Sequence, residues 1–148
     1  MSDRIEKSID LKASVARVWR ALTDSAEFGA WFRVDLDGPF VAGEEVRGRV
    51  THPGYEHLVW KATVVRMDEP TLFAFTWHPY AVDADVDYDS EPPTLVEFRL
   101  EALADGVRLT ICESGFDALP AERRDEAFLR NSGGWTAQVE NIRAHVER

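Results

Sequence analysis

The sequence predicts an α+β fold in which one long C-terminal helix covers an antiparallel sheet of six to seven strands. The helix is predicted for residues 120–146, where apolar side chains recur with the period of an α-helix. The sheet is predicted for residues 39–116, where short alternating segments are separated by turn residues. An antiparallel sheet usually hides one face from water, so we expect the helix to cover that face. The apolar stripe of the helix consists of Phe128, Trp135, Val139, Ile142 and Val146.

Length, composition and charge fit one domain that spans residues 1–148. Of the 148 residues, 45% are hydrophobic and 30% are charged, which is ordinary for a folded domain. The formal net charge of −10 repels nucleic acid and anionic lipid, so we expect neither as a partner. No apolar run reaches the roughly 18 residues of a membrane span. The single cysteine, Cys112, and the absence of a signal-peptide pattern predict a reducing, cytoplasmic location.

The N-terminal region predicts a strand followed by two short helices. Residues Arg4–Leu11 alternate apolar and polar side chains, with Lys7 as the exception, and are expected to form a strand with one buried face. Ser14 is placed to cap a first helix, and Asp24 a second helix that ends near Phe32. The apolar faces of the two helices consist of Val15, Val18, Trp19 and Leu22, and of Phe28, Trp31 and Phe32.

The middle of the chain predicts a series of hairpins, with strands at residues 44–51, 58–67, 72–78, 94–103 and 107–114 and a short extra strand at 34–37. Asp105-Gly106 is a strong two-residue hairpin signal. A loop made of these two residues sets Leu100 opposite Ile111 and Phe98 opposite Glu113. This parity turns Glu113 toward the buried face of the sheet.

The C-terminal helix is thin at one point. Between Phe128 and Trp135 its inner face holds only Asn131 and Ser132, followed by Gly133-Gly134. Either this thin segment faces a cavity over the sheet, or the two glycines divide the pattern into two helices with Ser132 as the second cap.

Few residues form a pattern typical of a catalytic, metal or cofactor site. The four histidines show neither helical pairing nor a cysteine partner, and the acidic stretch at 83–89 lacks the glycine of a calcium loop, so we expect no metal and no cofactor. Glu113 is the ionisable residue of interest, because a carboxyl group beside aromatic side chains is harder to ionise and would suit an acid or base. In the alternative interpretation, Glu113 lies at the end of a strand and its side chain reaches water. Asn131 either fixes the polar end of a ligand or satisfies backbone groups near the glycines.

Several short motifs resemble a known family in order and spacing across almost the whole chain. They are Val18-Trp19-Arg20-Ala21-Leu22-Thr23-Asp24, Trp31-Phe32, Phe75-Thr76-Trp77, Thr94-Leu95-Val96-Glu97-Phe98, Leu109-Thr110, Glu113-Ser114-Gly115-Phe116, Asn131 and Gly134-Trp135.

With these motifs the chain resembles the group of homologues of the heat-shock protein 90 ATPase activator, within the SRPBCC superfamily of START domains and the birch pollen allergen. The resemblance implies a helix-grip fold, one unbroken terminal helix, and a cavity between this helix and a curved sheet that commonly holds apolar ligands. Full-length activators carry a further N-terminal domain, and a chain of this length is not expected to include one.

Three functional hypotheses follow. The first is non-catalytic binding of a small hydrophobic ligand, lipid-like or aromatic, in the cavity between helix and sheet. The second is an enzyme of the cyclase or hydrolase type that uses Glu113 as acid or base, and the third is a co-chaperone-like module that binds a chaperone. Both a monomer and a homodimer are compatible with the sequence. The expected ligand-binding residues are Trp60, Phe75, Trp77, Phe98, Glu113, Phe128, Asn131, Trp135 and Val139.

Overall fold

The computed structural model describes residues 3–79 and 87–147, and it confirms the α+β class. Asp83 and Asp85, which belong to the acidic stretch at 83–89, lie outside the described residues. The elements follow in the order β1 (Arg4–Leu11), α1 (Val15–Thr23), α2 (Ser25–Phe32), β2 (Val34–Leu36), β3 (Glu45–Val50), β4 (Val59–Asp68), β5 (Leu72–Trp77), β6 (Thr94–Leu103), β7 (Gly106–Ser114) and α3 (Ala121–Val146). Two short 3₁₀ turns, Tyr88–Ser90 and Phe116–Ala118, precede β6 and α3.

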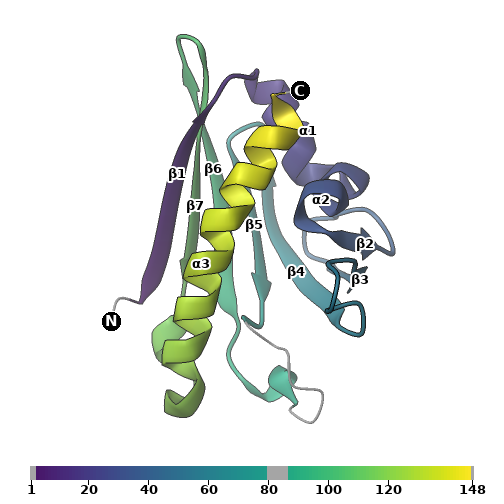
Figure 1. The fold of residues 1–148 in the computed structure, drawn as a ribbon, viewed down its shortest axis with the longest axis vertical. Helices are drawn as coiled ribbons and strands as arrows, with labels where there is room; N and C mark the ends of the chain where they lie inside the picture. The colour runs from purple at the N-terminus through teal and green to yellow at the C-terminus, as the bar shows by residue number, and fades with distance from the viewer. Residues whose placement is uncertain (1–2, 80–86, 148) are drawn as a thin grey trace.

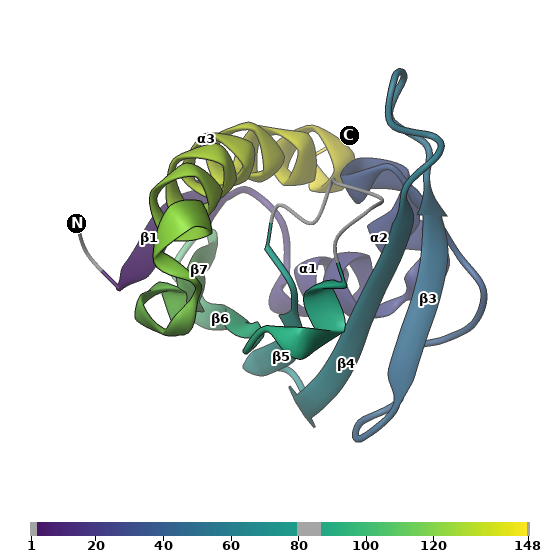
Figure 2. The same ribbon diagram turned by 90° about the horizontal axis from the view of Figure 1, so that it is seen from below.

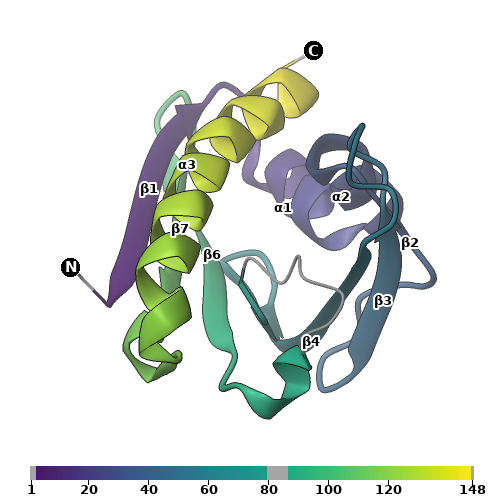
Figure 3. The same ribbon diagram turned by 60° about the horizontal axis from the view of Figure 1, so that its bottom comes forward.

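The seven strands form one antiparallel sheet with the order β1-β7-β6-β5-β4-β3-β2. Consecutive strands pair as hairpins from β2 to β7, and β1 closes the order by pairing with β7. The sheet is strongly curved, and α3 runs diagonally across its concave side (Figures 1 and 3). Viewed from below, α1 and α2 lie next to α3 on the same side of the sheet (Figure 2). The three helices therefore enclose the inner face together.

The hairpin register between β6 and β7 differs from the prediction by two residues. Phe98 pairs with Ile111, and Val96 pairs with Glu113, because Ala104 and Asp105 form the loop and Gly106 already pairs with Leu103. The glycine at position 106 allows the backbone of Leu11 to pass close to β7, and it is not part of the turn. A Cβ at this position would lie 2.1 Å from the carbonyl oxygen of Leu11. A shift of two residues keeps the parity, so Glu113 still faces inward.

The helix ends follow the predicted capping. The Ser14 side chain accepts a hydrogen bond from the backbone N–H of Arg17, and the Asp24 side chain accepts one from Glu27. The terminal helix α3 is continuous through Gly133 and Gly134, so the alternative of two helices is wrong. Both glycines are exposed.

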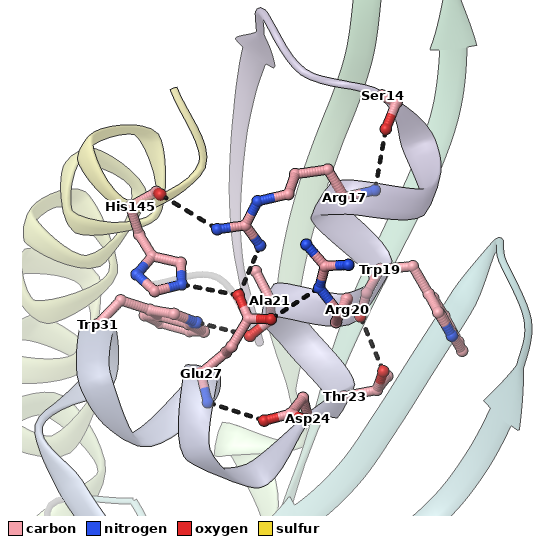
Figure 4. A network of polar contacts seen from close by, with 10 residues as sticks. All are labelled: Ser14, Arg17, Trp19, Arg20, Ala21, Thr23, Asp24, Glu27, Trp31 and His145. Atoms are coloured by element: carbon pink, nitrogen blue, oxygen red, sulfur yellow. Dashed lines mark hydrogen bonds and ion pairs between the residues drawn. The ribbon is translucent and has the colours of Figure 1, made fainter. Parts of the chain in front are cut away.

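The three helices are joined at one end by a polar network around Glu27 (Figure 4). Its carboxylate accepts hydrogen bonds from Arg17 and Arg20 of α1, and it lies 3.0 Å from Nε2 of His145 near the end of α3. Arg17 also donates to the backbone carbonyl of His145. This network, here called the Glu27 network, fixes α1 and α2 against the C-terminal end of α3.

Aromatic side chains fill much of the space between the helices and the sheet. Phe28 of α2 lies at the centre of this core, fully buried, and its ring centroid is 4.7 to 6.4 Å from those of five other rings. Burial of such rings provides most of the apolar driving force in a domain of this size. The neighbouring rings are Trp31, Phe32, Phe40, Trp60 and Phe75.

Candidate functional site

The side chain of Glu113 is fully buried on the inner face of β7, with 0% of its surface exposed. Val107, Leu109 and Ile111 share this face and are buried as well. The alternative in which Glu113 reaches water from a strand end is therefore wrong. A carboxyl group in such surroundings is costly unless protein groups hydrogen-bond to it.

Four neutral side chains supply these hydrogen bonds to Glu113. Oε2 accepts from the indole Nε1 of Trp77 at 2.7 Å and from the hydroxyl of Thr94 at 2.5 Å. Oε1 accepts from the indole Nε1 of Trp135 at 2.8 Å. The amide of Asn131 donates to both oxygens, at 2.9 and 3.1 Å. Five hydrogen bonds use the lone pairs of both oxygens, and we call this arrangement the Glu113 hub.

Neighbouring strands and one helix face bring the four donors together. Trp77 and Thr94 are directly paired across β5 and β6. Asn131 and Trp135 are four residues apart in α3, so they lie on the same face of the helix. The hub thus ties the middle of α3 to three strands of the sheet. Asn131 has its predicted inward position, and its amide donates to a side chain in place of the backbone.

A pocket with a volume of about 180 Å³ lies beside the hub, between α2, β5 and α3. Three aromatic residues from these elements line it: Phe32, Trp77 and Trp135. Their ring centroids are 5.7 to 6.3 Å apart. The remaining lining residues are Asn131, Gly134 and Gln138. The volume is below the roughly 300 Å³ at which pockets for drug-sized ligands begin, so only a small ligand or part of a larger one fits.

The predicted site residues fall into three groups. Trp77, Asn131 and Trp135 line the pocket, and Glu113 bonds to all three. Trp60, Phe75 and Phe98 belong to the aromatic core next to these residues, with centroid distances of 5.4 to 6.0 Å to Trp77 or Trp135. The last group lies elsewhere: Phe128 packs against Phe116, and Val139 lines a separate groove between α3 and β1.

Three lining residues were not predicted from the sequence: Phe32, Gly134 and Gln138. Phe32 ends α2 and looked like an ordinary core residue of a short amphipathic helix. Gln138 has the polar character of the solvent face, yet its amide donates to the backbone carbonyl of Phe32 at 3.4 Å. A helical wheel of α3 shows Gln138 next to Asn131 and Trp135, which was the available signal.

A second polar cluster lies at the neighbouring end of β5, where His78 contacts Asp89 at 3.5 Å and Asp89 pairs with Lys61 at 2.6 Å. Burial lowers the pKa of His78, and the Asp89 carboxylate offsets part of that shift. Among the described residues, no three His, Cys, Asp or Glu side chains converge as a metal site requires. Within the same part of the chain, no helix is long and apolar enough to cross a membrane.

The chain belongs to the family described as "Activator of Hsp90 ATPase homolog 1-like protein", whose model matches residues 12–147. This match agrees with the resemblance noted in the sequence motifs. No significant match was found among curated proteins.

Solved structures of low sequence identity share the fold over nearly the full chain. Protein MLL2253 from Mesorhizobium loti is 19% identical, with a TM-score of 0.77, and the match covers 98% of this chain and 97% of that protein. The Aha1 dimer from Colwellia psychrerythraea is 16% identical, with a TM-score of 0.74 and coverage of 99% and 97%. DynU16, a putative protein in the dynemicin biosynthetic locus, is 20% identical with a TM-score of 0.76; the match covers 99% of this chain but only 48% of DynU16.

Proposed function

We propose that the protein binds a small hydrophobic ligand, lipid-like or aromatic, in the pocket between α2, β5 and α3, without catalysing a reaction. The observation that carries this proposal is the pocket of about 180 Å³ lined by Phe32, Trp77 and Trp135, with the amide side chains of Asn131 and Gln138 beside them. A mostly apolar lining with a few fixed polar groups is typical of small-molecule sites.

A second observation supports a ligand in this region of the core. The indole Nε1 of Trp60 is buried and has no hydrogen-bond partner within the described part of the chain. The Trp60 ring lies 5.7 Å from Phe32 and 6.0 Å from Trp77, both of which line the pocket. A buried donor without an acceptor is costly. Trp60 does not itself line the pocket, so a ligand would have to extend past Phe32 or Trp77 to satisfy this donor.

The geometry of Glu113 favours binding over catalysis. A general acid or base must come within hydrogen-bond reach of the reacting atom. Both oxygens of Glu113 already accept bonds from Trp77, Thr94, Asn131 and Trp135, so a substrate would first have to displace one of them. We therefore assign Glu113 the role of holding the pocket-lining residues in place.

Native mass spectrometry of the purified protein tests the proposal. We expect an adduct that disappears when the protein is denatured in organic solvent. Two variants locate its site: Gly134 lines the pocket and Gly133 does not, while a Cβ at either position meets nothing within 4 Å. Gly134→Leu should abolish the adduct by filling the pocket, and Gly133→Leu should keep it. Loss in both variants, or in neither, places the adduct elsewhere and contradicts the proposal.

Membership of the activator family favours one further candidate, binding to a chaperone of the heat-shock protein 90 class in the cytoplasm. The net charge of −10 suits a partner with a basic surface. This candidate predicts that the purified protein, as monomer or homodimer, raises the ATPase rate of such a chaperone at low salt. An unchanged rate over a full titration would eliminate it.

A further inference from the structure

The Glu113 hub holds a fully buried carboxyl group that forms no ion pair with any of the described residues. The ion pairs of the described residues include no partner for Glu113. Its five hydrogen bonds come from indole, hydroxyl and amide groups, all neutral. Because an indole N–H only donates, and one faces each oxygen, this set of donors complements the ionised carboxylate.

The uncompensated charge lies directly behind the aromatic pocket. Trp77 and Trp135 each donate to the carboxylate and also line the pocket, together with Phe32. Aromatic faces attract cations through the ring quadrupole, most strongly for Trp and where water is excluded. The negative charge of the buried carboxylate adds to this attraction. The pocket therefore combines two independent sources of affinity for a positive group.

The saturation of the carboxylate restricts which cation fits. A metal ion, a primary ammonium or a guanidinium needs direct contact with oxygen lone pairs, and those of Glu113 are already used by Trp77, Thr94, Asn131 and Trp135. A quaternary ammonium group has no N–H to satisfy and needs only ring faces and a negative field. A cavity of about 180 Å³ corresponds to the liquid volume of about six waters, which accommodates a trimethylammonium group.

We propose that the pocket formed by Phe32, Trp77 and Trp135 binds a quaternary ammonium group of a small organic molecule, with the buried charge of Glu113 as its counterion. The inference rests on the proposed binding function of this pocket and specifies the chemistry of the ligand. The net charge of −10 adds attraction for a cation approaching from solution.

Choline and its neutral carbon analogue 3,3-dimethylbutan-1-ol test the inference, because they share shape and differ in charge. Each is titrated at matched ionic strength, with the indole N–H signals of Trp77 and Trp135 followed by ¹H–¹⁵N NMR. We expect both signals to shift and choline to bind at least about tenfold more tightly than the analogue. Equal affinities would overturn the cation inference and leave an apolar pocket intact. Unperturbed indole signals with choline would overturn it as well.

Two variants separate the contributions of charge and ring. Glu113→Gln should reduce the preference for choline over the analogue at least about threefold, while the ring faces of Phe32, Trp77 and Trp135 retain part of it. Because this variant risks misfolding, Phe32→Leu provides an independent test: it removes one ring that touches neither oxygen of Glu113, and it should weaken choline binding about fivefold or more. Phe40→Leu is the matched control, since Phe40 belongs to the same aromatic core without lining the pocket. Equal effects of the two Phe→Leu changes would contradict the proposal.

Discussion

Two glutamates join α3 to the rest of the protein, Glu113 at the middle of the helix and Glu27 at its C-terminal end, and they are stabilised in opposite ways. Glu27 is held by Arg17, Arg20 and His145, and 23% of its side chain is exposed (Figure 4). Glu113 is fully buried, and its hydrogen-bond donors among the described residues are all neutral. Among the described residues, Glu27 has cationic partners and Glu113 has none.

This difference in charged partners indicates that the Glu27 network has a structural role alone, whereas the Glu113 hub can also contribute to binding. Burial raises the pKa of Glu27, but the hydrogen bonds from His145, Arg17 and Arg20 outweigh it and lower the pKa to about 2. The Glu27 carboxylate thus has its counterions, Arg17 and Arg20, within the chain. At Glu113 the donors form hydrogen bonds to both carboxylate oxygens but carry no positive charge. A negative field therefore remains beside an aromatic pocket.

The largest expected effect is that of Glu113→Gln. The amide places N–H groups against donors, so at least one buried indole N–H loses its acceptor, and we expect a loss of about 3 kcal/mol in the free energy of unfolding. Urea denaturation followed by tryptophan fluorescence measures it. Glu101→Gln is the control, because the side chain of Glu101 is 70% exposed and its ion pair with Arg108 is long, at 3.8 Å. A loss below 1 kcal/mol for Glu113→Gln would show that the hub contributes little to stability.

Glu27→Gln should cost less, about 2 kcal/mol at neutral pH, because the network is partly exposed and screened by solvent. The pKa of about 2 in the folded protein lies below the ordinary value of 4.5. The stabilisation is therefore complete above about pH 4.5 and is lost as the pH falls toward 2. Denaturation of wild type and variant from pH 7 to pH 2.5 should show a shrinking difference. A difference independent of pH would mean that the charge of Glu27 is not responsible.

Two Trp→Phe changes compare the acceptors of the two regions. Trp135 donates to the Glu113 carboxylate at 2.8 Å, and Trp31 donates to the backbone carbonyl of Ala21 at 2.9 Å. Hydrogen bonds to charged groups contribute about 1.5 to 3 kcal/mol and neutral ones about 1 kcal/mol. We expect Trp135→Phe to destabilise the protein by about 1 kcal/mol more than Trp31→Phe in the same denaturation assay. The reverse order would contradict a stronger hydrogen bond at Glu113 than at the Ala21 carbonyl.

The smallest effect is expected for a glycine beside the Glu113 hub, and a glycine near Glu27 provides the contrast. At Gly134 an added Cβ meets nothing, so Gly134→Ala should stabilise α3 by about 0.5 to 1 kcal/mol. At Gly29, in α2 near Glu27, a Cβ would lie 2.2 Å from the carbonyl oxygen of Val34, so Gly29→Ala should destabilise the protein. Thermal unfolding by circular dichroism measures both changes. If Gly134→Ala lowered the melting temperature, the glycine would have a structural role that its surroundings do not reveal.

Much of the fold was predictable because local patterns determine it. The strand Arg4–Leu11 and both helix caps agree with their predictions, since alternation and capping depend on residues a few positions apart. The predicted register of β6 and β7 was wrong by two residues. Gly106 is a glycine because the backbone of Leu11, which is distant in sequence, packs against it, and not because it forms the turn. The inward position of Glu113 survived that error, since a shift of two residues preserves the faces of a strand.

The sequence by itself determined the order of the elements, the buried face of the first strand and of the strand that carries Glu113, the single long helix that the family resemblance favoured, and Glu113 as the residue of interest. Only the tertiary structure decided that four neutral side chains surround Glu113, that Phe32 and Gln138 complete a pocket, and that Glu27 meets His145 across 118 positions. The physical reason is range. Periodicity and capping act within one or two turns of the chain, whereas the balance of a buried charge depends on every element packed around it.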